Sequence, residues 1–383
     1  MDSLRSHIKL AAACLAISTI VPTVGATTAR ADVPSAAAIL QAGTNTGVAD
    51  GYPGVIGMIR DGNTVQYVSA GYGDSATKTT ADPQGQFRIG SLTKAFTSAV
   101  VLQLEAEGKL SLDDSVEKWL PGVVDSNGYS GANITIRELL NHTSGLPDYT
   151  GADAGLVGID YFANISPNAV YAPQTLVSTA LGSRAPVSAP GATWAYANTN
   201  YVLAGMIIQA VTGNTPGTEI TNRIIQPLGL TGTSFPATNQ LTGDFLHGYN
   251  DFWGFDGTYS NITMFGAAGA IVSTLPDLST FVQALIGGRL LPAAQTAELE
   301  TLVPEGNGAG NGYGLGIAQE KLPCGKTVWY HDGAVLGYHS YWFSNADGTQ
   351  QVLMMGNEYH GTEGGTKGQN DTQTALVNAY CAL

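Results

Sequence analysis

Residues 87–108, FRIGSLTKAFTSAVVLQLEAEG, join a short apolar run to a long apolar segment. Phe96, Val100 and Leu104 recur at four-residue spacing, and Gly108 follows the last of them. Apolar residues at this spacing form one face of a helix, and glycine is a common residue just past a helix end. The stretch therefore predicts a long apolar helix that ends at Gly108.

Ser91 and Lys94 stand at the start of this helix in an S-x-x-K arrangement. Residues three apart share a helix face, so the ammonium lies beside the hydroxyl. A serine nucleophile needs a partner that takes its proton, and a desolvated lysine can do this or can lower the pKa of another base. Without further motifs, Ser91 could equally be a simple helix cap. The same spacing recurs in polar or charged stretches, at Ser75–Lys78 and Ser115–Lys118.

Two further motifs favour a catalytic serine. Tyr-x-Asn occurs at Tyr196–Asn198 and again at Tyr259–Asn261, and His331-Asp332-Gly333 lies in a strand-like run. A tyrosine near a lysine can have its pKa lowered and act as a base, while an asparagine amide can hold a substrate carbonyl. Glycine in a strand permits close approach of another backbone, here that of a substrate.

Other chemistries are excluded by the motifs that the sequence lacks. It contains no G-x-S-x-G, no H-E-x-x-H, no P-loop and no G-x-G-x-x-G opening a helix after a strand. His331 and His339 could in principle pair on a metal, but Gly333 and Gly337 between them make a rigid ligand spacing improbable. We therefore expect neither a metal site nor a cofactor.

The wider pattern predicts an α/β protein. A helix and a hairpin turning at Asp61-Gly62-Asn63 come first, mostly helical signals follow to about residue 290, and strands then return before a final helix near Thr372–Tyr380. Capping signals open helices at Thr135–Glu138 and Thr274–Asp277. We predict one α/β domain built from both termini, residues 32–98 plus 266–383, with an inserted mostly helical domain at 99–265.

The N-terminal residues and the net charge of the chain predict where the protein is located and which partners it does not bind. Residues 1–31 have basic residues, an apolar core and an Ala29-Arg30-Ala31 cleavage signal, as in a secretory signal peptide. The formal charge of −14 becomes −16 without them, since three basic residues and one acidic residue leave. Such an acidic chain is not expected to bind nucleic acid. No later segment approaches a membrane span, so we expect a secreted protein without an anchor.

Two cysteines remain after the predicted cleavage, Cys324 and Cys381. An even number in an oxidising compartment favours a disulfide over two buried free thiols, and it would close a loop of 57 residues.

These motifs and their contexts resemble the penicillin-recognising serine hydrolases. The branch of class C β-lactamases and secreted D-alanyl-D-alanine carboxypeptidases fits best, a branch that includes D-stereospecific amidohydrolases and D-aminopeptidases. The similarity runs in family order from about residue 50 to 383. The matching segments are FRIGSLTKAFTSAVVLQLEAEGKLSLDDSVEKWLPG, ITIRELLNHTSGLPDYT, APGATWAYANTNYVLAGMII, AAGAIVSTLPDL, GYGLGI and WYHDGAVLGY.

The resemblance implies a β-lactamase/transpeptidase-like antiparallel sheet flanked by helices, and a two-step acyl transfer. Ser91 would attack an amide or ester carbonyl, Lys94 and Tyr196 would share the proton transfers, and Asn198 would position the substrate. The backbone N–H groups of Ser91 and Ala334 would form the oxyanion hole. The "PG…YAN" context selects Tyr196 over the second tyrosine motif. His331 would add positive potential near Tyr196, and the disulfide would match that of the carboxypeptidases.

Departures from the family pattern concern the substrate. Asp332 and Ala334 replace two hydroxyl residues that, with an arginine, hold the terminal carboxylate in the carboxypeptidases, and Ala318 lies near the arginine position. An aromatic residue expected beside the cleft appears as Met264, next to Phe265. If the face of residues 332 and 334 lines the cleft, a carboxylate stands where a substrate carboxylate would bind, which is unfavourable.

Two readings of Asp332 remain open. If it faces the cleft, the substrates are D-aminoacyl amides, esters or D-peptides without a carboxylate beside the scissile bond, and Asp332 pairs with a substrate ammonium. If it turns away into a local salt bridge, the chain is a D-alanyl-D-alanine carboxypeptidase that binds penicillin. A carboxylesterase, a β-lactamase and a non-hydrolytic β-lactam sensor are less favoured.

Overall fold

The computed structural model describes residues 34–151, 163–250, 254–306, 311–359 and 367–383. The predicted signal peptide, residues 1–31, lies outside these ranges. Within them, no helix is long and apolar enough to cross a membrane.

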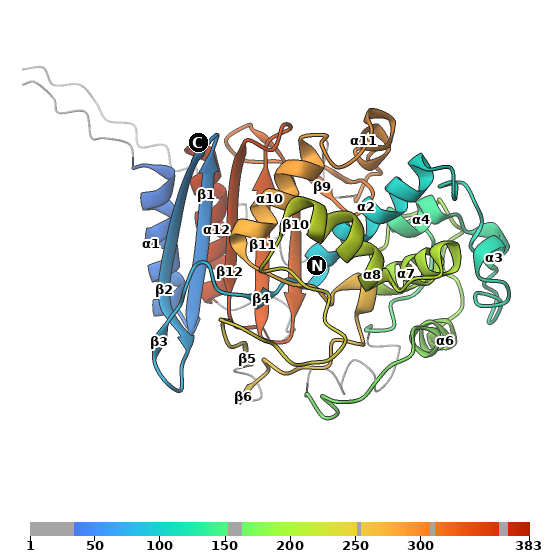
Figure 1. Ribbon diagram of the computed structural model, residues 1–383, viewed down its shortest axis with the longest axis horizontal. Coiled ribbons are helices and arrows are strands. Elements are labelled where there is room, and N and C mark those ends of the chain that lie inside the picture. Colours follow the sequence, from blue (N-terminus) through green and yellow to red (C-terminus); the bar gives the residue numbers. More distant parts are fainter. Residues whose placement is uncertain (1–33, 152–162, 251–253, 307–310, 360–366) are drawn as a thin grey trace, which may run out of the picture.

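An eight-stranded antiparallel sheet forms the centre of the molecule, with strand order β3-β2-β1-β12-β11-β10-β9-β8 (Figure 1). Its strands come from both ends of the chain: β1 (Gly54–Asp61), β2 (Thr64–Asp74), β3 (Thr79–Thr80), β8 (Gly312–Tyr313), β9 (Ala318–Lys321), β10 (Thr327–Val335), β11 (Tyr338–Ser344) and β12 (Gln350–Gly356). Strand β1 pairs with β12, so the first hairpin continues the C-terminal strands. The predicted α/β class is confirmed, whereas the division into two domains stays a prediction.

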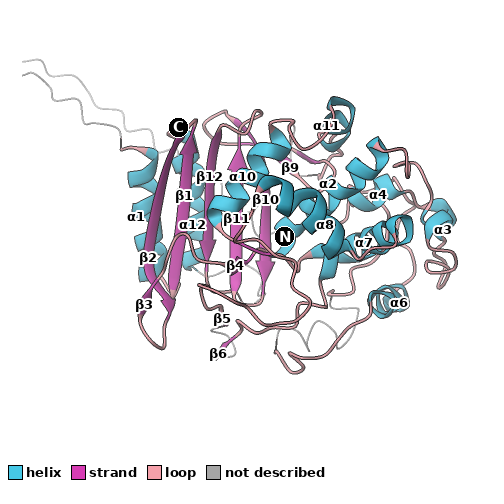
Figure 2. Ribbon diagram, viewed as in Figure 1, coloured by secondary structure: helices cyan, strands magenta, loops and turns pink. Residues whose placement is uncertain are grey.

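Helices cover both faces of the sheet (Figure 2). The helices are α1 (Ala36–Ala49), α2 (Thr93–Ala106), α3 (Val116–Trp119), α4 (Ile136–Leu140), α6 (Pro173–Ser183), α7 (Asn198–Thr212), α8 (Pro216–Ile220), α9 (Gln226–Leu228), α10 (Leu275–Ile286), α11 (Ala293–Leu299) and α12 (Lys367–Cys381). Helices α1 and α12 pack together and bury a smaller apolar core against one face. The larger core lies on the opposite face, among α2, α7, α10 and their neighbours.

Short strand pairs complete the architecture. They are β4 (Phe87–Arg88) with β7 (Val272–Ser273), and β5 (Tyr249–Asn250) with β6 (Phe255–Asp256). The β4–β7 pair leads directly into the turn that carries Ser91.

Local signals in the sequence set several of these elements. Thr135 and Glu138 form the predicted capping box of α4, and the side chain of Thr274 accepts from the N–H of Asp277 to cap α10. Gly62 has a φ of +58° in the turn between β1 and β2, a conformation that favours glycine. Helix α12 begins five residues earlier than the predicted Thr372. The predicted disulfide is present and ties Cys324, before β10, to Cys381 at the end of α12.

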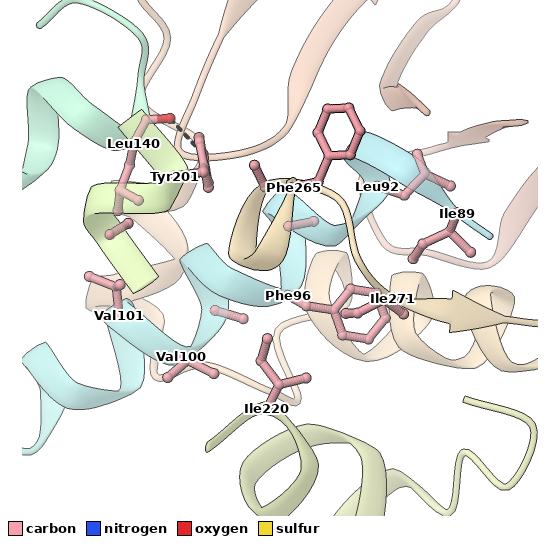
Figure 3. Close-up of a cluster of buried hydrophobic side chains, with 14 of the residues drawn as sticks. Ile89, Leu92, Phe96, Val100, Val101, Leu140, Tyr201, Ile220, Phe265 and Ile271 are labelled. Carbon is pink, nitrogen blue, oxygen red and sulfur yellow. Dashed lines mark hydrogen bonds between the residues drawn. The ribbon is translucent and has the colours of Figure 1, made fainter. Parts of the chain in front are cut away.

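Helix α2 is buried along almost its whole length and anchors the larger core (Figure 3). The ring of Phe96 stacks on that of Phe281 from α10, with centroids 3.5 Å apart and an interplanar angle of 9°. Helix α7 is held at the other end of this core, where the Tyr201 hydroxyl donates to the Leu140 carbonyl at 2.7 Å. Helix α2, which follows Ser91, is therefore held in a close-packed part of the molecule.

Candidate active site

Ser91 lies in a short 3₁₀ turn, Gly90–Leu92, that runs into α2. Gly90 has a φ of +53°, and a β-carbon at this position would lie 2.9 Å from the backbone nitrogen of Ala334 in β10. Only glycine allows so close an approach of the two segments. The residue before Ser91 therefore packs against the backbone of Ala334, and the oxyanion hole formed by the N–H groups of Ser91 and Ala334 stays a prediction.

Three predicted catalytic side chains meet at this turn. The Ser91 Oγ accepts from Lys94 Nζ at 3.0 Å and from Tyr196 Oη at 2.8 Å. Lys94 is fully buried, whereas Ser91 and Tyr196 are partly exposed. A substrate can thus reach the hydroxyl while the ammonium stays shielded from water.

Lys94 has two other partners, Asn198 Oδ1 and the carbonyl oxygen of Ala268, each at 2.8 Å. Both of these oxygens can only accept. Burial lowers the pKa of Lys94 to about 7, although the charges of Asp148 and Asp332 oppose this shift. When Lys94 is neutral, its two N–H bonds fit the two carbonyl-type oxygens, and its lone pair is left for the hydroxyl of Ser91.

The expected lowering of the pKa of Tyr196 is wrong. Burial raises its pKa well above the usual value, and the charges of Asp332 and Asp148 add to this effect, while the hydrogen bond with Ser91 opposes it. Tyr196 therefore stays protonated near neutral pH, and the group prepared to accept a proton is Lys94.

Asn198 binds protein groups at both ends of its amide. Besides accepting from Lys94, it donates from Nδ2 to Asp148 Oδ2 at 3.0 Å, and its backbone N–H lies 3.2 Å from the same oxygen. It therefore positions Lys94, and its expected contact with a substrate stays a prediction. Asp148 was not singled out by any motif, because its importance comes from its contact with Asn198, 50 residues away in the sequence.

His331 does not add the positive potential that was expected. It is buried, its Nδ1 lies 2.5 Å from the Asp332 carbonyl oxygen, and its Nε2 lies 2.9 Å from the hydroxyl of Tyr313. Burial lowers the pKa of His331 to about 4, so the ring is neutral at pH 7. The carbonyl can only accept, so the proton lies on Nδ1 and Tyr313 donates to Nε2.

Gly333 allows a close contact within the fold, whereas the approach of a substrate to this residue stays a prediction. A β-carbon on this residue would lie 2.0 Å from the carbonyl oxygen of Ile89, in the segment before Ser91. Ser340 strengthens the same junction, since its hydroxyl lies 3.3 Å from the Ile89 carbonyl and 3.4 Å from that of Gly333. The glycine is thus required for β10 to pack against the segment that leads to Ser91.

Asp332 lies on the opposite face of β10 from His331, as alternation along a strand dictates. Its Oδ2 is 3.9 Å from His339 Nε2, and its side chain remains 27% exposed. Burial opposes ionisation, but the interaction with His339 and other local groups outweighs it and lowers the pKa of Asp332 below its usual value. The structure therefore places the Asp332 carboxylate beside the imidazole of His339, while its charge also reaches Lys94 and Tyr196.

Met264 and Phe265 are buried and do not line an open surface. The Met264 side chain is fully buried, while its carbonyl accepts from the hydroxyl of Tyr149. Phe265 belongs to the cluster drawn in Figure 3. The expectation that they contact a substrate is wrong for Met264 in this structure, because packing in the core occupies its whole side chain.

The competing motifs lie elsewhere. Tyr259 is exposed, and the amide of Asn261 donates to the carbonyls of Ser166 and Ala169. Ser115 caps α3 through a bond from the N–H of Lys118. Within the described ranges, no group of three or more histidine, cysteine, aspartate or glutamate residues is placed to hold a metal ion.

Comparison with protein families identifies a match over most of the chain. The model of the family described as Beta-lactamase matches residues 37–375. Among curated proteins, Penicillin-binding protein 4* of Bacillus subtilis (strain 168) is 27% identical over 328 residues, which are 82% of this chain and 69% of that protein. Protein flp of Staphylococcus aureus (strain N315) is 35% identical over 195 residues, 50% of this chain but only 36% of its own length.

Solved structures give longer matches. A D-stereospecific amidohydrolase from Streptomyces sp. is 37% identical, with a TM-score of 0.78, and the match covers 89% of this chain and 98% of that one. The D-amino acid amidase from Ochrobactrum anthropi SV3, in complex with L-phenylalanine amide, is 25% identical with a TM-score of 0.75, covering 89% and 97% of the two chains.

Proposed function

Because this chain belongs to the beta-lactamase family and is a serine hydrolase of the beta-lactamase and penicillin-binding protein type, we propose that it cleaves amide, peptide or ester bonds of D-configured substrates through an acyl-enzyme on Ser91. The preferred substrates are D-aminoacyl amides and related molecules with a free ammonium group and no carboxylate beside the scissile bond. Solved relatives described as a D-stereospecific amidohydrolase and a D-amino acid amidase support the D configuration.

The charge around the nucleophile carries the substrate assignment. Asp148 and Asp332 both raise the pKa of Lys94 and of Tyr196, so their negative potential acts at the reacting groups. His331, the residue that could have balanced it, is neutral at pH 7. Negative potential in a shielded site attracts a substrate ammonium and disfavours a substrate carboxylate.

Proton transfers follow from the protonation states. Neutral Lys94 takes the proton of Ser91 as Oγ forms a bond to the substrate carbon. When the carbon–nitrogen bond breaks, Tyr196 gives its proton to the leaving nitrogen, and the ammonium of Lys94, 4.8 Å from the centre of the Tyr196 ring, restores it. Water then attacks the acyl-enzyme by the same steps in reverse, which releases the acid and regenerates Ser91.

The carbonyl oxygen of the substrate would be held by the N–H groups of Ser91 and Ala334. Gly90 and Gly333 support this arrangement, because their close packing fixes β10 against the turn before α2. Among the described residues, β9 pairs with β10 only at 327–330, so residues 331–335 border the site as a strand edge. Such donors stabilise the negative charge that develops on the oxygen.

Turnover of four substrates tests the proposal. We expect kcat/KM for a D-aminoacyl amide to exceed that for its L-enantiomer, for its N-acetylated form and for an acyl-D-Ala-D-Ala peptide, each by about tenfold or more. A preference for the acyl-D-Ala-D-Ala peptide would contradict the assignment. Mass spectrometry with an acylating ester should show an adduct on Ser91 that is lost in Ser91→Ala.

One observation favours a second candidate, a D-alanyl-D-alanine carboxypeptidase. The Asp332 carboxylate lies beside His339, with Oδ2 3.9 Å from Nε2, and so has a contact within the protein in place of a substrate ammonium. Asp332→Thr and Asp332→Asn separate the two cases. If Asp332 selects against carboxylates, both variants gain activity on acyl-D-Ala-D-Ala and lose it on the D-aminoacyl amide, whereas an unchanged ratio favours the carboxypeptidase.

Export from the cell is part of the proposal. It is supported by the leader-like composition of residues 1–31 and by the disulfide between Cys324 and Cys381, which is typical of oxidising compartments.

A further inference from the structure

His142 occupies the turn that ends α4, and its backbone conformation is unusual for its residue type. Its φ is +61°, its N–H bonds to the Leu139 carbonyl at 3.3 Å, and the next N–H, of Thr143, bonds to the Glu138 carbonyl at 3.0 Å. This pair of bonds is the Schellman arrangement, in which glycine or asparagine usually takes the left-handed position. A histidine in this conformation is strained relative to glycine, because its β-carbon crowds the backbone.

The same residue binds the chain on both sides of Tyr196. The carbonyl oxygen of His142 accepts from the N–H of Ala195 at 2.8 Å, and its Nδ1 accepts from the N–H of Ala197 at 3.2 Å. Between these two bonds, the imidazole lies against the phenol of Tyr196, with ring centroids 4.2 Å apart and an interplanar angle of 32°. His142 thus contacts Tyr196 through its backbone neighbours and its ring.

The hydrogen bonds fix the tautomer. A backbone N–H can only donate, so Nδ1 carries no proton and the neutral ring is protonated at Nε2. Asn200 Nδ2 donates to the same Nδ1 at 3.0 Å, and the amide is oriented by the Ser144 hydroxyl, which donates to Asn200 Oδ1 at 2.6 Å. Burial, with the nearby charge of Lys94, lowers the pKa of His142 well below its usual value, so the ring remains neutral.

The imidazole carries a second unfavourable feature. His142 is fully buried, and its Nε2 has no hydrogen-bond partner among the residues that the structure describes. A buried donor without a partner destabilises the folded state, because it has lost its hydrogen bond to water. Asparagine would avoid the backbone cost, since it tolerates the left-handed conformation, and its Oδ1 could accept from the N–H of Ala197. What only the imidazole adds is a flat ring against the phenol of Tyr196.

We propose that His142 is a positioning residue that holds the Tyr196 phenol at the Ser91 hydroxyl. The proposal rests on the function given above, in which Tyr196 protonates the leaving nitrogen. The effect of replacing His142 should therefore depend on the leaving group of the substrate. An amide nitrogen needs the proton, whereas p-nitrophenolate leaves without one.

His142→Asn tests this dependence, because it keeps the turn and one acceptor but removes the ring. We expect kcat for a D-aminoacyl amide to fall about 10- to 100-fold with KM within about twofold, whereas the burst rate of acylation by the matching p-nitrophenyl ester falls less than about threefold. A general loss of folding would slow both substrates alike. Equal losses on amide and ester therefore overturn the proposal.

A double-mutant cycle shows whether His142 acts through Tyr196. We expect Tyr196→Phe to reproduce the selective loss on the amide, and the double variant His142→Asn/Tyr196→Phe to be no slower than Tyr196→Phe alone, within about threefold. If the double variant is slower by the product of the two separate losses, the proposal is overturned. If Tyr196→Phe slows the amide but His142→Asn does not, only the role of His142 fails. If Tyr196→Phe leaves the amide rate unchanged, the acid role of Tyr196 in the proposed function fails as well.

His142→Gly guards against a folding defect in the asparagine variant. Glycine is the usual residue for this backbone conformation, so the turn should form, and the loss on the amide should equal that of His142→Asn. Thermal unfolding of both variants, compared with the native chain, confirms that the rates refer to folded protein. A folded glycine variant with full amide activity would overturn the proposal.

Discussion

Lys94 lies close to the midpoint of its titration at neutral pH, so a small change in local charge alters how much free base the site holds. Its pKa of about 7 is the result of two opposed effects, burial on one side and the charges of Asp148 and Asp332 on the other. The lowering of the pKa by burial comes from the packing of α2. The second can be removed by substituting single residues at the edge of the site.

The acidic limb of the pH profile should report this residue. Lys94 is a base only when neutral, so kcat/KM for a D-aminoacyl amide is expected to rise with pH through about 7. In Asp148→Asn the charge that favours the ammonium is gone, so the pKa of Lys94 falls and the rise moves to lower pH. The asparagine can still accept from Asn198, which preserves that contact.

Steady-state rates between pH 5.5 and 9 give the pH at the midpoint of the rise in kcat/KM. Asp256→Asn is the matched control, because Asp256 is an exposed carboxylate that pairs with His247 away from Lys94. A move of the midpoint to higher pH in Asp148→Asn, or an equal move in the control, would contradict the electrostatic role of Asp148.

At the scale of single elements, β10 is the part of the sheet on which the site depends. One face of the strand presents His331 and Gly333 to the segment that carries Ser91, and the other presents Asp332. Its position along the strand direction is held by pairing with β11 and, at residues 327–330, with β9. A small displacement of β10 therefore changes the distance between Ala334 and Ser91.

Gly333→Ala should produce such a displacement. The new methyl group would lie 2.0 Å from the Ile89 carbonyl, so the strand or the turn must move. We expect a loss of about 1–3 kcal/mol in the free energy of unfolding and a fall of at least about 100-fold in kcat.

Gly182→Ala is a control of the same chemical change. Gly182 lies within α6, and a β-carbon there meets no atom within 4 Å. Since alanine is the better helix former, this variant should keep full activity and gain up to about 1 kcal/mol. Urea unfolding and turnover compare the two variants, and an active, stable Gly333→Ala would show that the junction tolerates a side chain.

Over the whole molecule, the sheet separates two apolar cores, and the larger one encloses neutral histidines. His142 and His331 are both buried, and burial lowers the pKa of each. Unfolding exposes them to water and restores their ordinary pKa. The folded state therefore binds fewer protons than the unfolded state in mildly acidic solution.

The stability of the protein should fall as the pH drops below about 6.5. For His331, whose pKa falls from 6.5 to about 4, the loss is complete near pH 4 and amounts to about 3 kcal/mol. Lys94 titrates above this window. His331→Gln should flatten the dependence of the free energy of unfolding on pH between 5 and 6.5, as measured by urea unfolding of the variant and the native chain. An unchanged slope in His331→Gln would show that His331 is protonated in the folded state.

Many of the helices and turns could be predicted from short segments of the sequence. The apolar spacing after Ser91 gave the long buried helix, the threonines before α4 and α10 marked their starts, and Asp61-Gly62-Asn63 marked the first hairpin. These signals depend on a few consecutive residues and on backbone geometry, so they can be predicted without knowing what packs around them.

Partners distant in the sequence could not be predicted in the same way. Asp148, Asn198 and Lys94 form one hydrogen-bonded line only because α2, α7 and the loop before residue 150 converge. Nothing in the sequence around His142 indicates that it would lie against Tyr196, 54 positions away. Such contacts depend on how whole elements pack, which no short motif records.

The sequence by itself determined which residues could perform the chemistry: a serine, a lysine and a tyrosine in ordered motifs, in a chain with strands at both ends. Only the tertiary structure decided the protonation states of these residues and showed which backbone contacts require Gly90 and Gly333. A pKa depends on how completely a group is removed from water and which charges remain near it, and burial and proximity exist only once the chain is folded. In the proposed mechanism the lysine is therefore the base and the tyrosine the acid. In the structure His331 is a neutral hydrogen-bonding residue, and Gly333 is the point where the sheet meets the segment before Ser91.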